Sequence, residues 1–203
     1  MKVKLCGIQK TNHLEAAAEA GADYIGLMFA ESKRKISVER AEELAAVGPP
    51  HIKRVGVFVN PSQNEIDEAV QKANLDIIQL HGDESPEFCK NQKKPVMKAF
   101  SITSADDFER MKDYDVDYYL VDAPGTEYRG GSGKRFDWSL IPEDSLPGKL
   151  VLAGGLTPDN VYEAVQQVQP YAVDVSSGVE INGEKDINKM IAFIKEAKRS
   201  AAQ

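Results

Sequence analysis

Residues 150–180 read LVLAGGLTPDNVYEAVQQVQPYAVDVSSGVE and contain two short apolar runs, each followed at once by a loop of small residues. Leu150 to Ala153 leads into Gly154-Gly155, and Ala172 to Val175 leads into Ser176-Ser177-Gly178. Both runs are too short to be helices. We therefore predict two strands, each with a small-residue loop at its carboxyl end.

The segment between these two strands has the pattern of a helix. Apolar residues recur at helical spacing from Val161 to Val168. Thr157, directly before Pro158, is typical of an N-cap with proline in the first turn. The whole stretch is therefore a predicted βαβ unit.

Glycine and serine loops at strand ends expose backbone N–H groups to an anion, because glycine has no Cβ to hold the anion away. In (βα)8 barrels the loops after strands seven and eight commonly form a phosphate site. The alternative is that the glycines only make tight turns. Because two such loops occur at successive strand ends, we predict a phosphate site formed by Gly154, Gly155, Ser176, Ser177 and Gly178.

The rest of the chain repeats the alternation of strand and helix, with helix caps expected at Thr11 or Asn12 and at Ser37, and with Pro61 and Ser62 opening a further helix. Strand and helix alternate eight times without a linker, which favours a closed barrel over a doubly wound sheet. We predict an α/β fold, a single-domain (βα)8 TIM barrel over residues 1–203. The expected strands are Val3–Ile8, Tyr24–Phe29, Arg54–Val59, Ile77–Leu80, Val96–Phe100, Tyr118–Val121, Leu150–Ala153 and Ala172–Val175.

Composition bounds the class of protein. The chain has 203 residues, of which 42% are hydrophobic, and a formal net charge of −7. This charge argues against a general nucleic-acid-binding protein, and no apolar run approaches the roughly 20 residues of a membrane span. The N-terminus lacks the apolar region of a secretory signal, and two cysteines without a CxxC pair indicate neither structural zinc nor a disulfide framework. We expect a cytoplasmic protein.

In a barrel of this kind, functional residues lie at the carboxyl ends of the strands. Cys6 lies in the closing residues of the first predicted strand, and Asp122 follows the sixth. Cys6 is either a small buried hydrophobe or, as a thiolate, a base or nucleophile whose pKa nearby positive charge lowers. Asp122 either braces the next loop or acts as a general acid. Spacing alone leaves both choices open.

Three further residues are candidates at the same face. Arg34 belongs either to a solvated basic loop or to a carboxylate clamp, since guanidinium pairs bidentately with carboxylate. His81, after the fourth strand, is a pocket wall or a substrate contact. Asp174, inside the last strand, bonds a substrate hydroxyl or satisfies the barrel interior.

The longest predicted loop, Ala123 to Asp137, contains Gly-Gly-Ser-Gly-Lys at 130–134. This segment lacks the spacing of a nucleotide P-loop, and we interpret it as a lid. No His-x-x-x-His pair or carboxylate cluster in the sequence indicates a metal site.

A series of short motifs runs in order along nearly the whole chain, and its most specific parts are Cys6-Gly7-Ile8 and Ser176-Ser177-Gly178-Val179-Glu180. The remaining motifs are Lys4-Leu5, Ser32-Lys33-Arg34, VGVFVN at 55–60, QLHG at 79–82, GGSG at 130–133 with FDW at 136–138, AGGL at 153–156, Asp174-Val175, and Gly183 with Lys185-Asp186. Together they resemble the phosphoribosylanthranilate isomerase family of tryptophan biosynthesis.

The resemblance implies an Amadori rearrangement of N-(5-phosphoribosyl)anthranilate to 1-(2-carboxyphenylamino)-1-deoxyribulose 5-phosphate. It implies Asp122 as the general acid that protonates the furanose oxygen and Cys6 as the general base that takes the proton from the second sugar carbon. Arg34 would hold the anthranilate carboxylate, and the two small-residue loops would hold the phosphate. The expected partner is a small phosphoribosyl substrate, with no cofactor and no metal, and a monomer is expected rather than a homodimer.

Three alternatives stay open. Another barrel isomerase acting on a phosphoribosyl metabolite, as in histidine biosynthesis, would place a carboxylate where Cys6 stands. A lyase such as indoleglycerol phosphate synthase would need a lysine acid and a pocket glutamate, for which Lys98 is the candidate. A non-catalytic barrel would bind the phosphorylated product without turnover.

Overall fold

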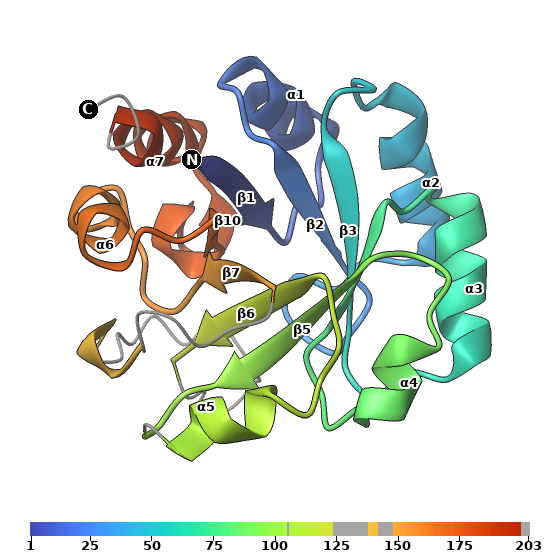
Figure 1. Cartoon of the computed structure of the whole chain (residues 1–203). Helices are drawn as coiled ribbons and strands as arrows, with labels where there is room; N and C mark the ends of the chain where they lie inside the picture. The colour runs from blue at the N-terminus through green and yellow to red at the C-terminus, as the bar shows by residue number, and fades with distance from the viewer. Residues whose placement is uncertain (105, 124–137, 142–147, 200–203) are drawn as a thin grey trace.

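The protein is built around an eight-stranded parallel barrel, seen in a computed structural model that describes residues 1–104, 106–123, 138–141 and 148–199 (Figure 1). The strands pair in sequence order, and β8 pairs with β1, so the barrel closes. The predicted (βα)8 architecture is confirmed. The strands are β1 Lys2–Cys6, β2 Tyr24–Met28, β3 Lys53–Phe58, β4 Ile77–Leu80, β5 Val96–Ser101, β6 Tyr118–Asp122, β7 Lys149–Leu152 and β8 Ala172–Val175.

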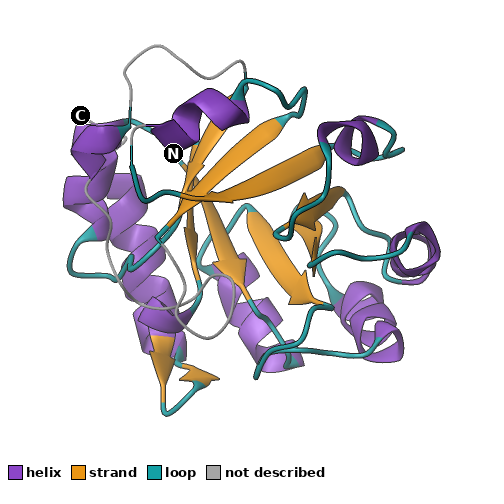
Figure 2. Ribbon diagram, turned by 90° about the horizontal axis from the view of Figure 1, so that it is seen from below, coloured by secondary structure: helices purple, strands orange, loops and turns teal. Residues whose placement is uncertain are grey.

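Helices surround the barrel on its outside (Figure 2). A short antiparallel pair, β9 Glu180–Ile181 and β10 Glu184–Lys185, follows β8. In the described parts of the chain, no helix is both long and apolar enough to cross a membrane. The helices are α1 Thr11–Glu19, α2 Val38–Val47, α3 Gln63–Lys72, α4 Pro86–Lys90, α5 Asp106–Met111, α6 Val161–Val168 and α7 Ile187–Arg199, with 3₁₀ turns η1 Trp138–Leu140 and η2 Ser177–Val179.

The predicted cap at Ser37 and the predicted helix start at Pro61 and Ser62 are confirmed. The Ser37 hydroxyl accepts a hydrogen bond from the backbone of Arg40 at the start of α2. Ser62 forms a capping box with Glu65 at the start of α3. Both serines satisfy N–H groups that the first helical turn leaves without an intrahelical partner.

The other two predicted caps are wrong. Lys10 occupies the N-cap of α1, so Thr11 and Asn12 already lie inside the first turn. In the βαβ unit, α6 begins only at Val161. The Asn160 side chain accepts from the Thr157 N–H and donates to the carbonyl of Gly155, both at 2.9 Å, and so fixes the turn that precedes the helix. The helix therefore starts one turn later than the Thr-Pro pair predicts.

Buried hydrophobic side chains form two clusters, one inside the barrel and a larger one between the strands and the helices. Because side chains alternate along a strand, the inward-facing positions can be followed toward the carboxyl ends. On β6, the inward residues Tyr118 and Leu120 are followed by Asp122, and on β8, Ala172 is followed by Asp174. The apolar barrel interior thus changes to polar groups at one end.

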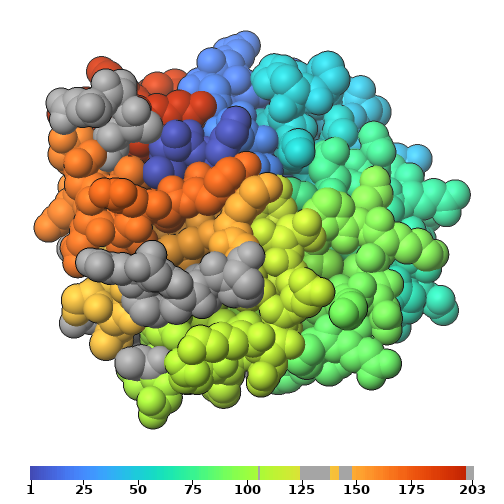
Figure 3. All heavy atoms as spheres, viewed as in Figure 1, coloured from blue at the N-terminus to red at the C-terminus, as the bar shows by residue number. Residues whose placement is uncertain are grey.

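The first and last strands of the barrel lie side by side. The N-terminal strand β1 pairs with β8, and the space-filling view shows the N-terminal residues directly beside the C-terminal segments (Figure 3). This closure brings residues near position 6 next to residues near position 176.

Candidate active site

Four of the predicted site residues lie at one end of the barrel. Cys6 is the last residue of β1, and Asp122 is the last residue of β6. His81 directly follows β4, and Asp174 lies on the inner side of β8. All four are buried, and because the strands are parallel their carboxyl ends open on the same face.

The Cys6 thiol lies beside a buried ion pair. Lys4 precedes Cys6 by two residues on β1 and so faces the same side, and its ammonium donates to Asp174 Oδ2 at 2.9 Å. Burial raises the pKa of Cys6 above its ordinary value, and the positive charges of Lys4 and Lys185 offset only part of that rise. This direction is opposite to the lowering suggested by the sequence, because burial outweighs the nearby charge. The free protein therefore holds Cys6 mainly as a thiol at neutral pH.

His81 and Asp122 approach each other at the mouth of the barrel. Nε2 of His81 lies 3.8 Å from Asp122 Oδ2, and Nδ1 of the same ring lies 3.4 Å from Nε2 of Gln79. Gln79 is two residues earlier on β4 and faces the same side. The imidazole thus lies beside the Asp122 carboxyl at this end of the barrel.

The loops after β7 and β8 are in contact, as a shared phosphate site requires. A Cβ on Gly178 would lie 1.9 Å from the carbonyl oxygen of Leu156, so only glycine fits where the two loops meet. Gly154 has a φ of +84°, and a Cβ there would lie 2.8 Å from Asp122 Oδ1. The loops therefore approach each other and the end of β6, while their binding of phosphate stays a prediction. The residues predicted to bind the phosphate are Gly154, Gly155, Ser176, Ser177 and Gly178.

Arg34 lies in the loop after β2 and reaches the segment that follows β8. Its Nε donates to Glu180 Oε1 at 2.7 Å, and its Nη2 donates to Glu180 Oε2 at 2.8 Å. The buried Lys185 donates to the same Glu180 carboxylate at 2.6 Å and to the carbonyl of Ser176 at 2.9 Å. Arg34 is thus held in a network of two cations and one carboxylate, and it is not simply a solvated basic side chain.

Comparison with known proteins assigns the chain to a family. The family model of N-(5'-phosphoribosyl)anthranilate (PRA) isomerase matches residues 3–196. The chain belongs to this family. The N-(5'-phosphoribosyl)anthranilate isomerase of Listeria innocua is 50% identical over 199 residues, which cover 98% of each chain. The resemblance carried by the sequence motifs is confirmed.

Solved structures of PRA isomerases share the whole barrel. The enzyme of Thermotoga maritima aligns with a TM-score of 0.91 at 41% identity, covering 98% of this chain and 99% of that chain. A second structure, in complex with reduced 1-(o-carboxyphenylamino)-1-deoxyribulose 5-phosphate, aligns with a TM-score of 0.86 at 38% identity over 98% and 99% of the two chains. The PRA isomerase fold therefore extends over nearly the full length of the chain.

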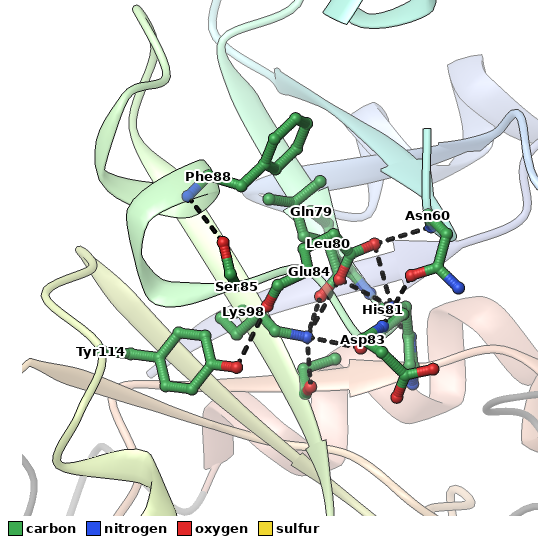
Figure 4. A network of polar contacts seen from close by, with 12 residues as sticks. Asn60, Gln79, Leu80, His81, Asp83, Glu84, Ser85, Phe88, Lys98 and Tyr114 are labelled. Carbon is green, nitrogen blue, oxygen red and sulfur yellow. Dashed lines mark hydrogen bonds and ion pairs between the residues drawn. The ribbon is translucent and has the colours of Figure 1, made fainter. Parts of the chain in front are cut away.

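Lys98 does not provide the lysine acid of the lyase alternative. It lies on the face of β5 opposite to the inward residues Met97 and Ala99, and it is 2% exposed. Its ammonium donates to the carbonyl of Gly82 at 2.7 Å and to Glu84 Oε2 at 3.1 Å (Figure 4). These bonds lie outside the barrel, so Lys98 braces the segment after His81 instead of facing the barrel interior.

Sequence reasoning missed three charged residues of the site. Lys4 could have been found from its spacing to Cys6, because residues two apart share a strand face. Glu180 and Lys185 belong to motifs that carry the family resemblance, but nothing local marks them as partners of Arg34. The predicted lid is the loop from Ala123 to Asp137, of which residues 124–137 lie outside the described residues. Among the residues that are described, no three His, Cys, Asp or Glu side chains are grouped to hold a metal.

Proposed function

We propose that this chain converts N-(5-phosphoribosyl)anthranilate into 1-(2-carboxyphenylamino)-1-deoxyribulose 5-phosphate, an Amadori rearrangement of tryptophan biosynthesis. Membership of the PRA isomerase family supports this activity. The observation that carries the proposal is the pair of Cys6 and Asp122 at one end of the barrel, on strands separated by β7 and β8. Such an isomerisation needs one proton donor and one proton acceptor on different sides of the bound sugar.

In the proposed mechanism, Asp122 gives its proton to the furanose ring oxygen, and the bond from that oxygen to C1 breaks to leave a protonated Schiff base. Cys6, as a thiolate, takes the proton from C2, and an enolamine forms. The enolamine then gains a proton at C1 and loses the proton on the C2 oxygen, which gives the ketone. Every proton removed is matched by one added, as an isomerisation requires.

The remaining site residues are proposed to bind and orient the substrate. The loops after β7 and β8 take the phosphate at one end, and Arg34 takes the anthranilate carboxylate at the other. Asp174 Oδ1 is buried and has no hydrogen-bond donor among the described residues, which supports a bond from a sugar hydroxyl. His81 contacts the substrate beside Asp122. Fixing both ends of the substrate lowers the entropy cost of bringing C2 to the base.

The activity is tested by generating phosphoribosylanthranilate in situ, adding the purified chain with a metal chelator, and following the ketose by chromatography. We expect complete conversion that depends on the protein. A folded protein that binds the reduced product but leaves the substrate unchanged would reject the proposal, and the aminoaldose of histidine biosynthesis would be the next substrate to test.

The cytoplasmic location and the monomeric state remain predictions. Among the described residues, the large hydrophobic side chains that are exposed are scattered over separate elements, at Val47, Tyr171, Ile181 and Ile191. Light scattering should give a mass near 22.3 kDa, and a doubled mass would contradict the expectation.

A further inference from the structure

The Arg34 guanidinium uses only one of its two donor edges within the protein. Nε and Nη2 bind the two oxygens of Glu180 at 2.7 and 2.8 Å, which is a side-on fork. A guanidinium has five N–H groups, so both hydrogens of Nη1 and one of Nη2 remain. No described residue accepts a hydrogen bond from Nη1. The end edge of the guanidinium can therefore pair with a second carboxylate.

Glu180 is itself rigidly held. Its side chain is 7% exposed, and its Oε1 also accepts from Lys185 Nζ at 2.6 Å. Its backbone carbonyl accepts from Lys189 Nζ at 3.2 Å. Burial acts to raise the pKa of Glu180, but hydrogen bonds from Arg34 and Lys185 outweigh it and hold that pKa below its ordinary value. The Glu180 carboxylate therefore stays charged at neutral pH and keeps both hydrogen bonds from Arg34.

The same network connects Arg34 to both functional ends of the site. The Arg34 stem packs on Gly7, next to Cys6, since a Cβ on Gly7 would lie 2.6 Å from Arg34 Cδ. Lys185, which binds Glu180, also donates to the carbonyl and hydroxyl of Ser176 at 2.9 and 3.2 Å. The direction of the arginine is therefore set by the segment that includes the predicted phosphate loop.

We propose that Glu180 is a positioning residue, which directs the end edge of the Arg34 guanidinium toward the anthranilate carboxylate of the substrate. This inference rests on the proposed function. A prearranged arginine loses less side-chain entropy on binding than a mobile one, so the carboxylate gains affinity. Glu180 itself does not touch the substrate.

Two other roles for Glu180 give different results. If Glu180 competed with the substrate carboxylate for Arg34, its removal would strengthen binding of carboxylate ligands. If Glu180 only stabilised the fold, its removal would weaken all ligands equally. A positioning role weakens only those ligands that carry the carboxylate.

The test measures dissociation constants by calorimetry for two probes: the reduced product 1-(2-carboxyphenylamino)-1-deoxyribulose 5-phosphate, and the same compound without the ring carboxylate. The wild-type protein should prefer the first probe, and Arg34→Ala should abolish the preference. Glu180→Gln keeps an acceptor for Nε but loses the one for Nη2. We expect it to reduce the preference at least about tenfold while the second probe binds as before. The matched control is Glu184→Gln, an exposed carboxylate on the same antiparallel pair, which should leave both constants unchanged.

Equal weakening of both probes, unchanged binding, or tighter binding of the first probe by Glu180→Gln would each overturn the proposal. If Glu180→Gln does not fold, Glu180→Asp can be tested in its place. This variant keeps the negative charge but moves the carboxylate away from Arg34 by the length of one methylene group. We expect the same loss of preference for the probe that carries the ring carboxylate. If the wild-type protein bound both probes equally well, the role of Arg34 as a carboxylate clamp in the proposed function would be rejected instead. Conversion of phosphoribosylanthranilate by the wild type, measured separately, tests the activity itself.

Discussion

Lys4 donates a 2.9 Å hydrogen bond to Asp174 across the β1–β8 pairing, one inward-facing position below the Cys6 thiol. The ammonium side of this pair lowers the pKa of Cys6, and the carboxylate side raises it. Burial raises it further and decides the net direction. The ionisation of the proposed base therefore depends on a balance of charges buried in the barrel.

This balance predicts how the Cys6 thiol ionises with pH. The pKa of Cys6 is raised, so the free protein should hold little thiolate at neutral pH, and the thiolate fraction should grow only as the pH rises toward that pKa. Lys4→Met removes the nearest opposing charge and leaves the Asp174 carboxylate, so the thiolate should form only at still higher pH. The ultraviolet absorbance of the thiolate, recorded against pH with and without Lys4→Met and corrected with Cys6→Ser, measures this shift. An unchanged titration would argue against Lys4 as the charge that stabilises the thiolate.

Replacing Asp122 by Asn removes the proposed acid and keeps the shape of the side chain. General acid catalysis contributes about 10²- to 10⁴-fold, so kcat should fall by this order while the reduced product binds nearly as tightly. The measurement is steady-state conversion together with calorimetry. Near-normal turnover would remove Asp122 from the proposed mechanism.

Gly178→Ala tests the contact between the two loops. The added methyl would stand 1.9 Å from the Leu156 carbonyl and force the loop after β8 away from the loop after β7. If these loops bind the phosphate, the loss of one charge-assisted hydrogen bond should raise KM on the order of tenfold. Inhibition by inorganic phosphate should weaken in parallel. A raised KM with unchanged phosphate inhibition would place the phosphate elsewhere.

Lys98→Met tests the structural role of the Lys98–Glu84 pair. The substitution leaves Glu84 buried without its cation, and breaking such a pair costs about 3–5 kcal/mol in the free energy of unfolding. The double variant Lys98→Met with Glu84→Gln should recover part of this loss, because the amide oxygen still accepts from the backbone of Asn60 or Gly82. Urea unfolding measures all three proteins. A single variant as stable as the wild type would contradict the role assigned to Lys98.

The barrel could be predicted because its signals are local. Apolar runs of strand length ending in small or polar residues marked all eight strands, and Ser37 and Ser62 cap their helices through neighbouring N–H groups. The N-cap predicted at Thr157 is wrong because the Asn160 side chain fixes a turn before the helix, and the helix begins after that turn. That outcome depends on side-chain geometry and not on residue type.

The contacts between residues inside the candidate site could not be predicted from the sequence. Arg34 and Glu180 are 146 residues apart, and Lys4 and Asp174 are 170 apart, so both pairs depend on barrel closure and strand register. The direction of the pKa shift of Cys6 could not be predicted either, because burial and nearby charge oppose each other there. Position along a strand identifies a site residue, but its partners and ionisation need the three-dimensional structure.

The most direct test of the account compares the turnover of Cys6→Ser with that of Cys89→Ser, which alters the other buried cysteine, on α4. We expect Cys6→Ser to reduce conversion of phosphoribosylanthranilate by at least about 10²-fold without loss of affinity for the reduced product. Cys89→Ser should turn over at close to the wild-type rate. If Cys6→Ser retained normal turnover, the thiol at the end of β1 would not be the base.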